Sequence, residues 1–164
     1  MGFWKKKQPL STPDLLHDLD LLAKAEAQIA KFYARCGEID SGDRDFWLQL
    51  ADNENQHHDL IRRMSQLVTF NPNQYRPGND IKPGAIRLFR MQVTDLIGQI
   101  SAETSHRQLL EHAAQLENSA AGLGLEELIA TTDEEFKRLA QAVADESAKH
   151  RNTIEKKLAT LNAI

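Results

Sequence analysis

Residues 43–68 read DRDFWLQLADNENQHHDLIRRMSQLV. Apolar residues recur in this stretch at steps of three and four, which places them along one face of an α-helix. The apolar stripe consists of Trp47, Leu50, Ile61, Met64 and Val68, and Glu54 and His57 interrupt it. The stretch therefore predicts a helix whose apolar face carries a carboxylate and an imidazole one turn apart.

Similar periodicity covers most of the chain. Besides 43–68, it predicts helices over about 13–36, 83–100, 105–121 and 132–161. Gly37 is the expected stop of the first helix, and the most clearly non-helical segment is 71–80. We therefore expect an all-α four-helix bundle of two antiparallel hairpins, 11–70 and 104–164, joined by a crossover, 71–103, that carries its own helix.

Composition fits one domain over residues 11–164, preceded by a flexible basic tail at 1–10. Of the 164 residues, 41% are hydrophobic and 27% are charged, as in ordinary globular proteins.

The net charge of −4 and the lack of a basic stripe argue against a nucleic-acid partner. The single cysteine, Cys36, excludes an internal disulfide or a cysteine-rich metal site. No apolar run is long enough for a membrane span, and we expect a cytoplasmic protein.

The other long helices also carry polar residues on their apolar stripes. Glu26 interrupts the first, Glu117 the penultimate, and Ser147 and His150 the last. No lysine or arginine occupies these stripes, so nothing on them would neutralise the glutamates. Converging buried carboxylates must be protonated or bridged by a cation. A divalent metal with carboxylate and imidazole ligands satisfies this requirement.

An internal repeat relates the two halves of the chain. The segment LADNENQH at 50–57 aligns with VADESAKH at 143–150, so His57 matches His150 and Glu54 matches Ser147. Glu26 matches Glu117, which lies 91 residues later, whereas His57 and His150 are 93 residues apart. A duplicated hairpin would bring both half-sites to the centre of the bundle.

The first half of the chain resembles the rubrerythrin branch of the ferritin-like family. The resemblance covers about 16–64 and rests on Glu26, Ile29, Phe32-Tyr33, Phe46, Leu50-Ala51, Glu54 and His57. The second half matches weakly, because Gly122-Leu123 stands where an aromatic pair is expected. The resemblance implies a ferritin-like bundle that holds two iron ions and reduces peroxide or dioxygen or handles iron.

Carried over residue by residue, the resemblance implies a set of metal ligands: Glu26, Glu54, His57, Glu117 and His150. Ser147 stands where the family has a second bridging glutamate, and Glu146 beside it is a candidate replacement. Tyr33 is expected to act as a hydrogen-bonding or redox residue next to the metals. Iron is the expected metal, as two ions or as one if the second half-site is lost, with manganese or zinc as alternatives.

Two functions remain open at this point. We expect a homodimer in either case. If the chain is an enzyme, it is an iron-dependent oxidoreductase, peroxidase-like or ferroxidase-like, and another protein supplies its electrons. The alternative is a non-catalytic ferritin-like bundle that serves as an interaction or dimerisation module, with the amphipathic segment 86–100 as its contact face.

Overall fold

The computed structural model describes residues 11–78 and 84–162, so the predicted tail at 1–10 lies outside the described residues. The described part contains five α-helices and one pair of short strands. The helices are α1 (Thr12–Ile39), α2 (Arg44–Phe70), α3 (Ala85–Gln99), α4 (His106–Ala121) and α5 (Glu134–Asn162). The strands are β1 (Tyr75–Pro77) and β2 (Ile129–Thr131).

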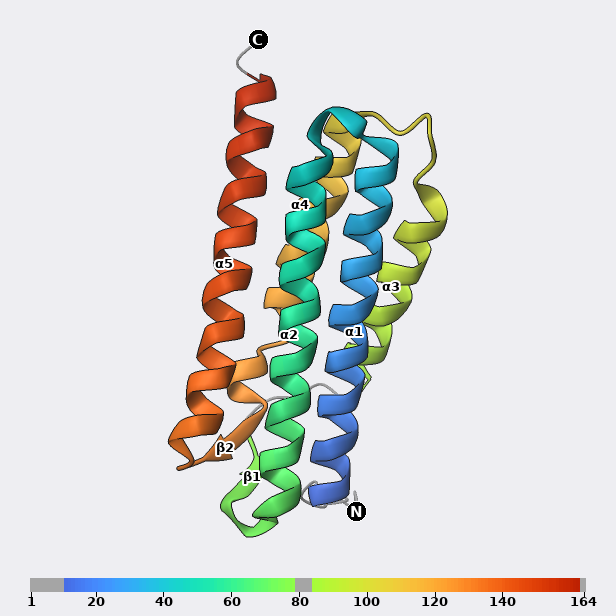
Figure 1. The fold of residues 1–164 in the computed structure, drawn as a ribbon. Helices are drawn as coiled ribbons and strands as arrows, with labels where there is room; N and C mark the ends of the chain where they lie inside the picture. The colour runs from blue at the N-terminus through green and yellow to red at the C-terminus, as the bar shows by residue number, and fades with distance from the viewer. Residues whose placement is uncertain (1–10, 79–83, 163–164) are drawn as a thin grey trace, which may run out of the picture.

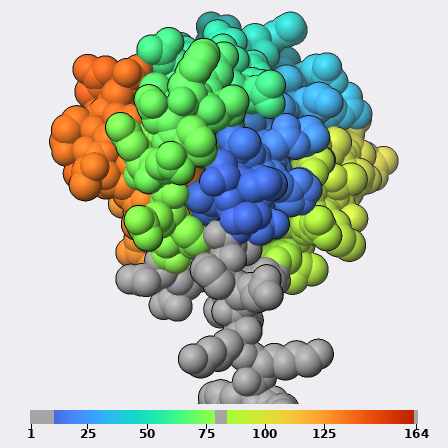
Figure 2. All heavy atoms as spheres, turned by 90° about the horizontal axis from the view of Figure 1, so that it is seen from below, coloured from blue at the N-terminus to red at the C-terminus, as the bar shows by residue number. Residues whose placement is uncertain are grey.

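Four long helices lie side by side, and α3 lies outside them along α1 (Figure 1). α1 packs against α2 and α3, while α5 packs against α2 and α4. Each of the pairs α1–α2 and α4–α5 is antiparallel (Figure 1). Seen from below, the first turns of α1 lie beside the end of α2 and the start of α3 (Figure 2). These features confirm an all-α fold made of two helical hairpins and a crossover.

Side-chain caps fix the first residues of two helices. Asp14 accepts a hydrogen bond of 2.8 Å from the backbone N–H of Ser11 at the start of α1. At the start of α4, Gln108 accepts one of 2.9 Å from the N–H of Ser105, while the Ser105 hydroxyl accepts from the N–H of Gln108. Such caps satisfy N–H groups that a helix leaves without internal partners.

The prediction that Gly37 stops the first helix was wrong. α1 continues through Gly37 to Ile39. Gly37 is buried, and a Cβ added to it would lie 3.4 Å from Cβ of Trp47 on α2. The glycine therefore serves the close packing of α1 on α2 rather than the end of α1.

The two strands were not predicted. β1 and β2 pair antiparallel, with Tyr75 opposite Thr131 and Pro77 opposite Ile129. Next to this pair, the N–H of Gly78 donates to the carbonyl of Leu128 over 2.9 Å. The strands therefore fasten the crossover after α2 to the connection between α4 and α5.

The core is apolar towards both ends of the bundle and polar in between. One apolar cluster includes Phe32, Tyr33, Trp47 and Leu109, and the other includes Leu19, Ile61, Met64 and Leu128. Among the described residues, the buried charged or ionisable positions outside these clusters are Glu54, His57, Glu117 and His150. No helix in this part of the chain is both long and apolar enough to cross a membrane.

Candidate metal centre

Five of the six predicted ligands lie together between the long helices. Glu54 and His57 come from α2, Glu117 from α4 and His150 from α5, and each is no more than 3% exposed. Glu26 joins them from α1, with 13% of its side chain exposed. Burial of three carboxylates without a lysine or arginine among them requires protons or a cation.

Glu54 lies at the middle of this cluster. Its Oε1 is 2.9 Å from Nδ1 of His150, and its Oε2 is 3.2 Å from Nδ1 of His57. The two imidazole rings stack on one another, with centroids 5.5 Å apart and planes at 25°. Each oxygen of a single carboxylate thus faces a different imidazole, which is the arrangement of a bridging ligand.

The remaining carboxylates complete two donor sets that share Glu54. Oε2 of Glu26 is 3.9 Å from Nδ1 of His57, and Oε1 of Glu117 is 3.5 Å from Nδ1 of His150. Within each set, one potential ligand atom per residue lies within 4.8 Å of the others. The structure therefore places two three-residue donor sets side by side.

The hydrogen bonding of the imidazoles favours ligation. Nδ1 of His150 is buried and has no hydrogen-bond partner among the described residues, whereas in His57 the nitrogen without a partner is Nε2 and Nδ1 lies within hydrogen-bond distance of Glu54. Nδ1 of His150 is close to Glu54, but the two groups are not aligned for a hydrogen bond. Nδ1 of His150 and Oε1 of Glu54 are 2.9 Å apart without a hydrogen bond between them, as expected for two ligands that point at the same ion. Carboxylate and imidazole ligands fit iron, manganese or zinc.

Tyr33 and Asn53 hold two members of the cluster. The hydroxyl of Tyr33 donates to Oε1 of Glu117 over 2.5 Å. Nδ2 of Asn53 lies 3.1 Å from Nε2 of His150, and Oδ1 of Asn53 accepts from Gln49 over 3.0 Å. A second partner of this kind fixes the orientation of a ligand imidazole. The periodicity did not reveal Asn53, because it lies next to Glu54 and off the apolar stripe.

Burial and charge oppose one another in the metal-free cluster. Burial, with repulsion from Glu54, raises the pKa of Glu26 well above its usual value. Burial also raises the pKa of Glu54 and lowers that of His57. Burial alone would lower the pKa of His150, but the nearby carboxylates of Glu117 and Glu54 outweigh it and raise that pKa to about 10. Burial therefore favours the protonated forms of Glu26 and Glu54.

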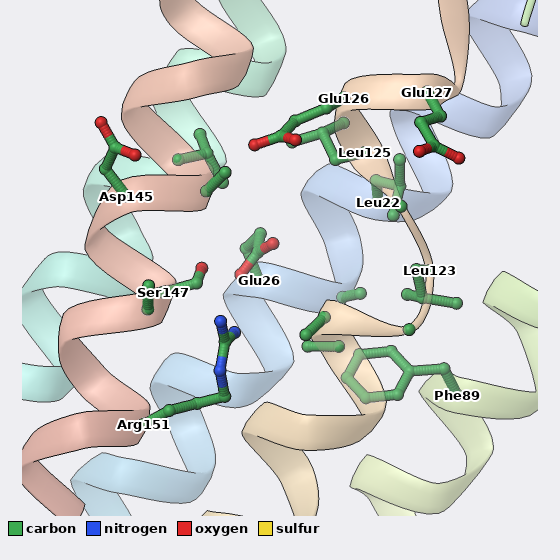
Figure 3. Close-up of a pocket in the computed structure, with 18 residues that line it drawn as sticks. Leu22, Glu26, Phe89, Leu123, Leu125, Glu126, Glu127, Asp145, Ser147 and Arg151 are labelled. Atoms are coloured by element: carbon green, nitrogen blue, oxygen red, sulfur yellow. The ribbon is translucent and has the colours of Figure 1, made fainter.

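The sixth predicted ligand, Glu146, does not join the cluster. Its side chain is 42% exposed and forms an ion pair with Lys149, which lowers its pKa. The neighbouring Ser147 instead faces a pocket of about 540 Å³ that reaches Glu26 (Figure 3). The position that the repeat aligns with Glu54 thus carries no carboxylate in the structure.

A second group of acidic residues and a histidine lies near the start of α2. Asp40 accepts hydrogen bonds from Nε1 of Trp47 over 2.8 Å and from His106 over 2.6 Å. Asp43 in the same group pairs with Lys157 over 2.5 Å. Because its carboxylates already have donors, this group ties the helix ends together and needs no metal.

Comparison with known proteins adds no assignment. No protein-family model, no curated protein and no solved structure matches the chain. The two donor sets that share Glu54 therefore provide the structural basis for any function assigned to this chain.

Proposed function

We propose that the chain is a rubrerythrin-like, non-haem di-metal carboxylate protein in a ferritin-like bundle, with iron as its metal. The observation that carries the proposal is the position of Glu54, whose two oxygens face His57 and His150 at 3.2 and 2.9 Å. The proposed activity is reduction of peroxide or dioxygen, or oxidation of ferrous iron. When bound, a metal pair would supply the electrons and the Lewis acidity that such reactions need.

The residues of the chain have distinct roles in this proposal. Glu54 lies between the two positions, while Glu26 with His57 and Glu117 with His150 flank it on either side. Tyr33 is a positioning residue, because its hydroxyl fixes the carboxylate of Glu117. The apolar clusters on either side lower the local dielectric constant, which strengthens the electrostatic interactions within the site.

Electrons would come from another protein. The only cysteine, Cys36, is buried, and burial raises its pKa to about 12, so its thiol is a poor redox group. A transient partner that delivers electrons therefore belongs to the proposal, and so does the predicted homodimer.

Metal content tests the proposal directly. Protein loaded anaerobically with ferrous iron, and in parallel with manganese or zinc, is desalted and its metals are counted per chain. We expect two ions, anomalous scattering at Glu54 in crystals, and peroxide consumption by the iron form. Glu155→Gln, at an exposed position on α5, is the matched control for Glu54→Gln. A chain that retains no metal after loading would refute the proposal.

One observation favours the non-catalytic alternative. His150 has a raised pKa and lies 2.9 and 3.5 Å from Glu54 and Glu117, so its imidazolium partly neutralises them without a metal. In that case the bundle would be a structural module. Glu54→Gln would then leave the melting temperature unchanged or raised, and added metal would not alter the melting temperature of the wild-type protein.

A further inference from the structure

The ligand set does not explain a pocket beside Glu26. Its volume of about 540 Å³ is in the range of pockets that hold small organic molecules. Figure 3 shows Glu26 on its inner wall, with Ser147 and Arg151 reaching in from α5. The pocket therefore connects the surface with one of the two donor sets.

The pocket reaches the metal centre at the position where the repeat lacks a carboxylate. Ser147 aligns with Glu54, and its short side chain leaves space next to Glu26 that a glutamate would occupy. Of the donor set of Glu26, Glu54 and His57, it is Glu26 that lines the pocket. A carboxylate from outside the chain could fill this space.

Arg151 provides a cation at the same place. It follows Ser147 by one helical turn, and its guanidinium is directed towards Ser147 and Glu26 (Figure 3). The side chain is half-buried and forms no ion pair with the residues that the structure describes. A guanidinium binds a carboxylate through two parallel hydrogen bonds.

The rest of the lining is mostly apolar near the centre and acidic at the mouth. Leu22, Phe89 and Leu123 line the inner part. Glu126, Glu127 and Asp145 also line the pocket; all three are exposed, and water screens their charges. An alkyl chain suits the apolar wall, while a second negative charge near the mouth would be repelled.

We propose that this pocket binds a small amphipathic monocarboxylate. Its carboxylate pairs with Arg151 and occupies the space beside Ser147, and its alkyl chain lies against Leu22, Phe89 and Leu123. The inference deepens the proposed function, on which it rests, by naming the class of substrate or ligand that reaches the metal centre.

Octanoate is a suitable probe, and calorimetry on the metal-free and the zinc-loaded protein measures its binding without any turnover. We expect octanoate to bind both forms, more tightly with zinc, and octanol and inorganic phosphate to bind about tenfold more weakly or worse, because each lacks one of the two recognised features. Octanol binding as tightly as octanoate, or phosphate displacing it, would overturn the assignment of a carboxylate.

Variants of α5 locate the binding. Arg151→Gln should weaken octanoate about tenfold, Arg151→Lys should restore most of the affinity, and Arg138→Gln, at an exposed position on the same helix, should change nothing. Ser147→Glu should block octanoate and increase the zinc retained per chain. Equal affinity of wild type and Arg151→Gln, both folded by circular dichroism, would overturn the inference.

The two proposals fail in different ways. Zinc retention without octanoate binding overturns the carboxylate pocket and leaves the metal centre supported. Octanoate binding that depends on Arg151 in a protein that retains no metal overturns the metal centre and supports the pocket as a carboxylate site.

Discussion

Glu54→Gln should remove both metal ions from the centre, whereas Glu26→Gln should remove one. Glutamine preserves the size of Glu54 but replaces an anionic oxygen with an amide nitrogen and leaves a neutral amide oxygen. Because the two oxygens of Glu54 face His57 and His150, this change weakens both donor sets. Glu26 belongs to only one set, together with Glu54 and His57.

The size of the effect follows from linkage between metal binding and folding. Metal present at a hundredfold excess over its dissociation constant stabilises the folded state by about 2.7 kcal/mol. In a chain of 164 residues, this corresponds to a rise in melting temperature of roughly 5–11 °C. For Glu54→Gln we expect a rise below about 2 °C, because neither donor set retains its shared anionic ligand.

Two measurements check this prediction. Metal analysis after anaerobic loading should give two ions for the wild type, one for Glu26→Gln and none for Glu54→Gln. Differential scanning calorimetry with and without metal should give the same order, and the exposed control Glu155→Gln should behave as the wild type. If Glu54→Gln kept the wild-type metal count, Glu54 would not be the shared ligand, and our interpretation of the cluster would be wrong.

Three further predictions concern the protein without metal. Tyr33→Phe removes the hydroxyl that donates to the buried carboxylate of Glu117. The free energy of unfolding in urea should therefore fall by about 1–3 kcal/mol, while the number of metal ions bound per chain stays unchanged. An unaltered urea midpoint would contradict this prediction. Folding raises the pKa of His150 from 6.5 to about 10, so its contribution is complete below pH 6.5 and is lost as the pH rises through 10. The urea midpoint of the wild type should therefore fall between pH 6.5 and 10, and that of His150→Gln should fall less steeply. A midpoint that rises with pH would show that folding does not raise the pKa of His150. Gly78→Ala would place a Cβ 1.6 Å from the carbonyl oxygen of Glu127. The variant should therefore lose the pairing of β1 with β2, and its melting temperature should fall by several degrees. Normal protection of the backbone amides of β1 and β2 from hydrogen exchange would disprove the close approach.

The helices could be predicted because their signal is local. The stripe of 43–68 depends only on the spacing of residues within one element, and the helix lies at Arg44–Phe70. The role of Gly37 depends on Trp47 across the hairpin, and nothing local distinguishes a packing glycine from a terminating one. The strands β1 and β2 have three residues each and pair across more than fifty residues of sequence, so no periodicity could reveal them.

The same distinction applies to the candidate metal centre. Glu54 and His57 interrupt a strong stripe one turn apart, so their position could be predicted from a single helix. Asn53 and Arg151 lie beside ligands but off the stripes, and only the packed bundle shows that Asn53 reaches His150 and that Arg151 faces the pocket. The outward direction of Glu146 agrees with its place about 100° around the helix from Ser147.

Besides the missing aromatic pair at Gly122-Leu123, the second half departs from the first at Ser147, which aligns with Glu54. A glutamate at residue 147 would supply another carboxylate and would take up part of the space beside Glu26. A serine there supplies no carboxylate and faces the pocket that reaches Glu26, while Arg151 places a cation one turn away. Loss of a ligand by itself would leave no reason for an arginine directed into the same opening. Together, the small residue and the neighbouring cation are what a site needs in order to take one carboxylate from its substrate instead of from its own chain.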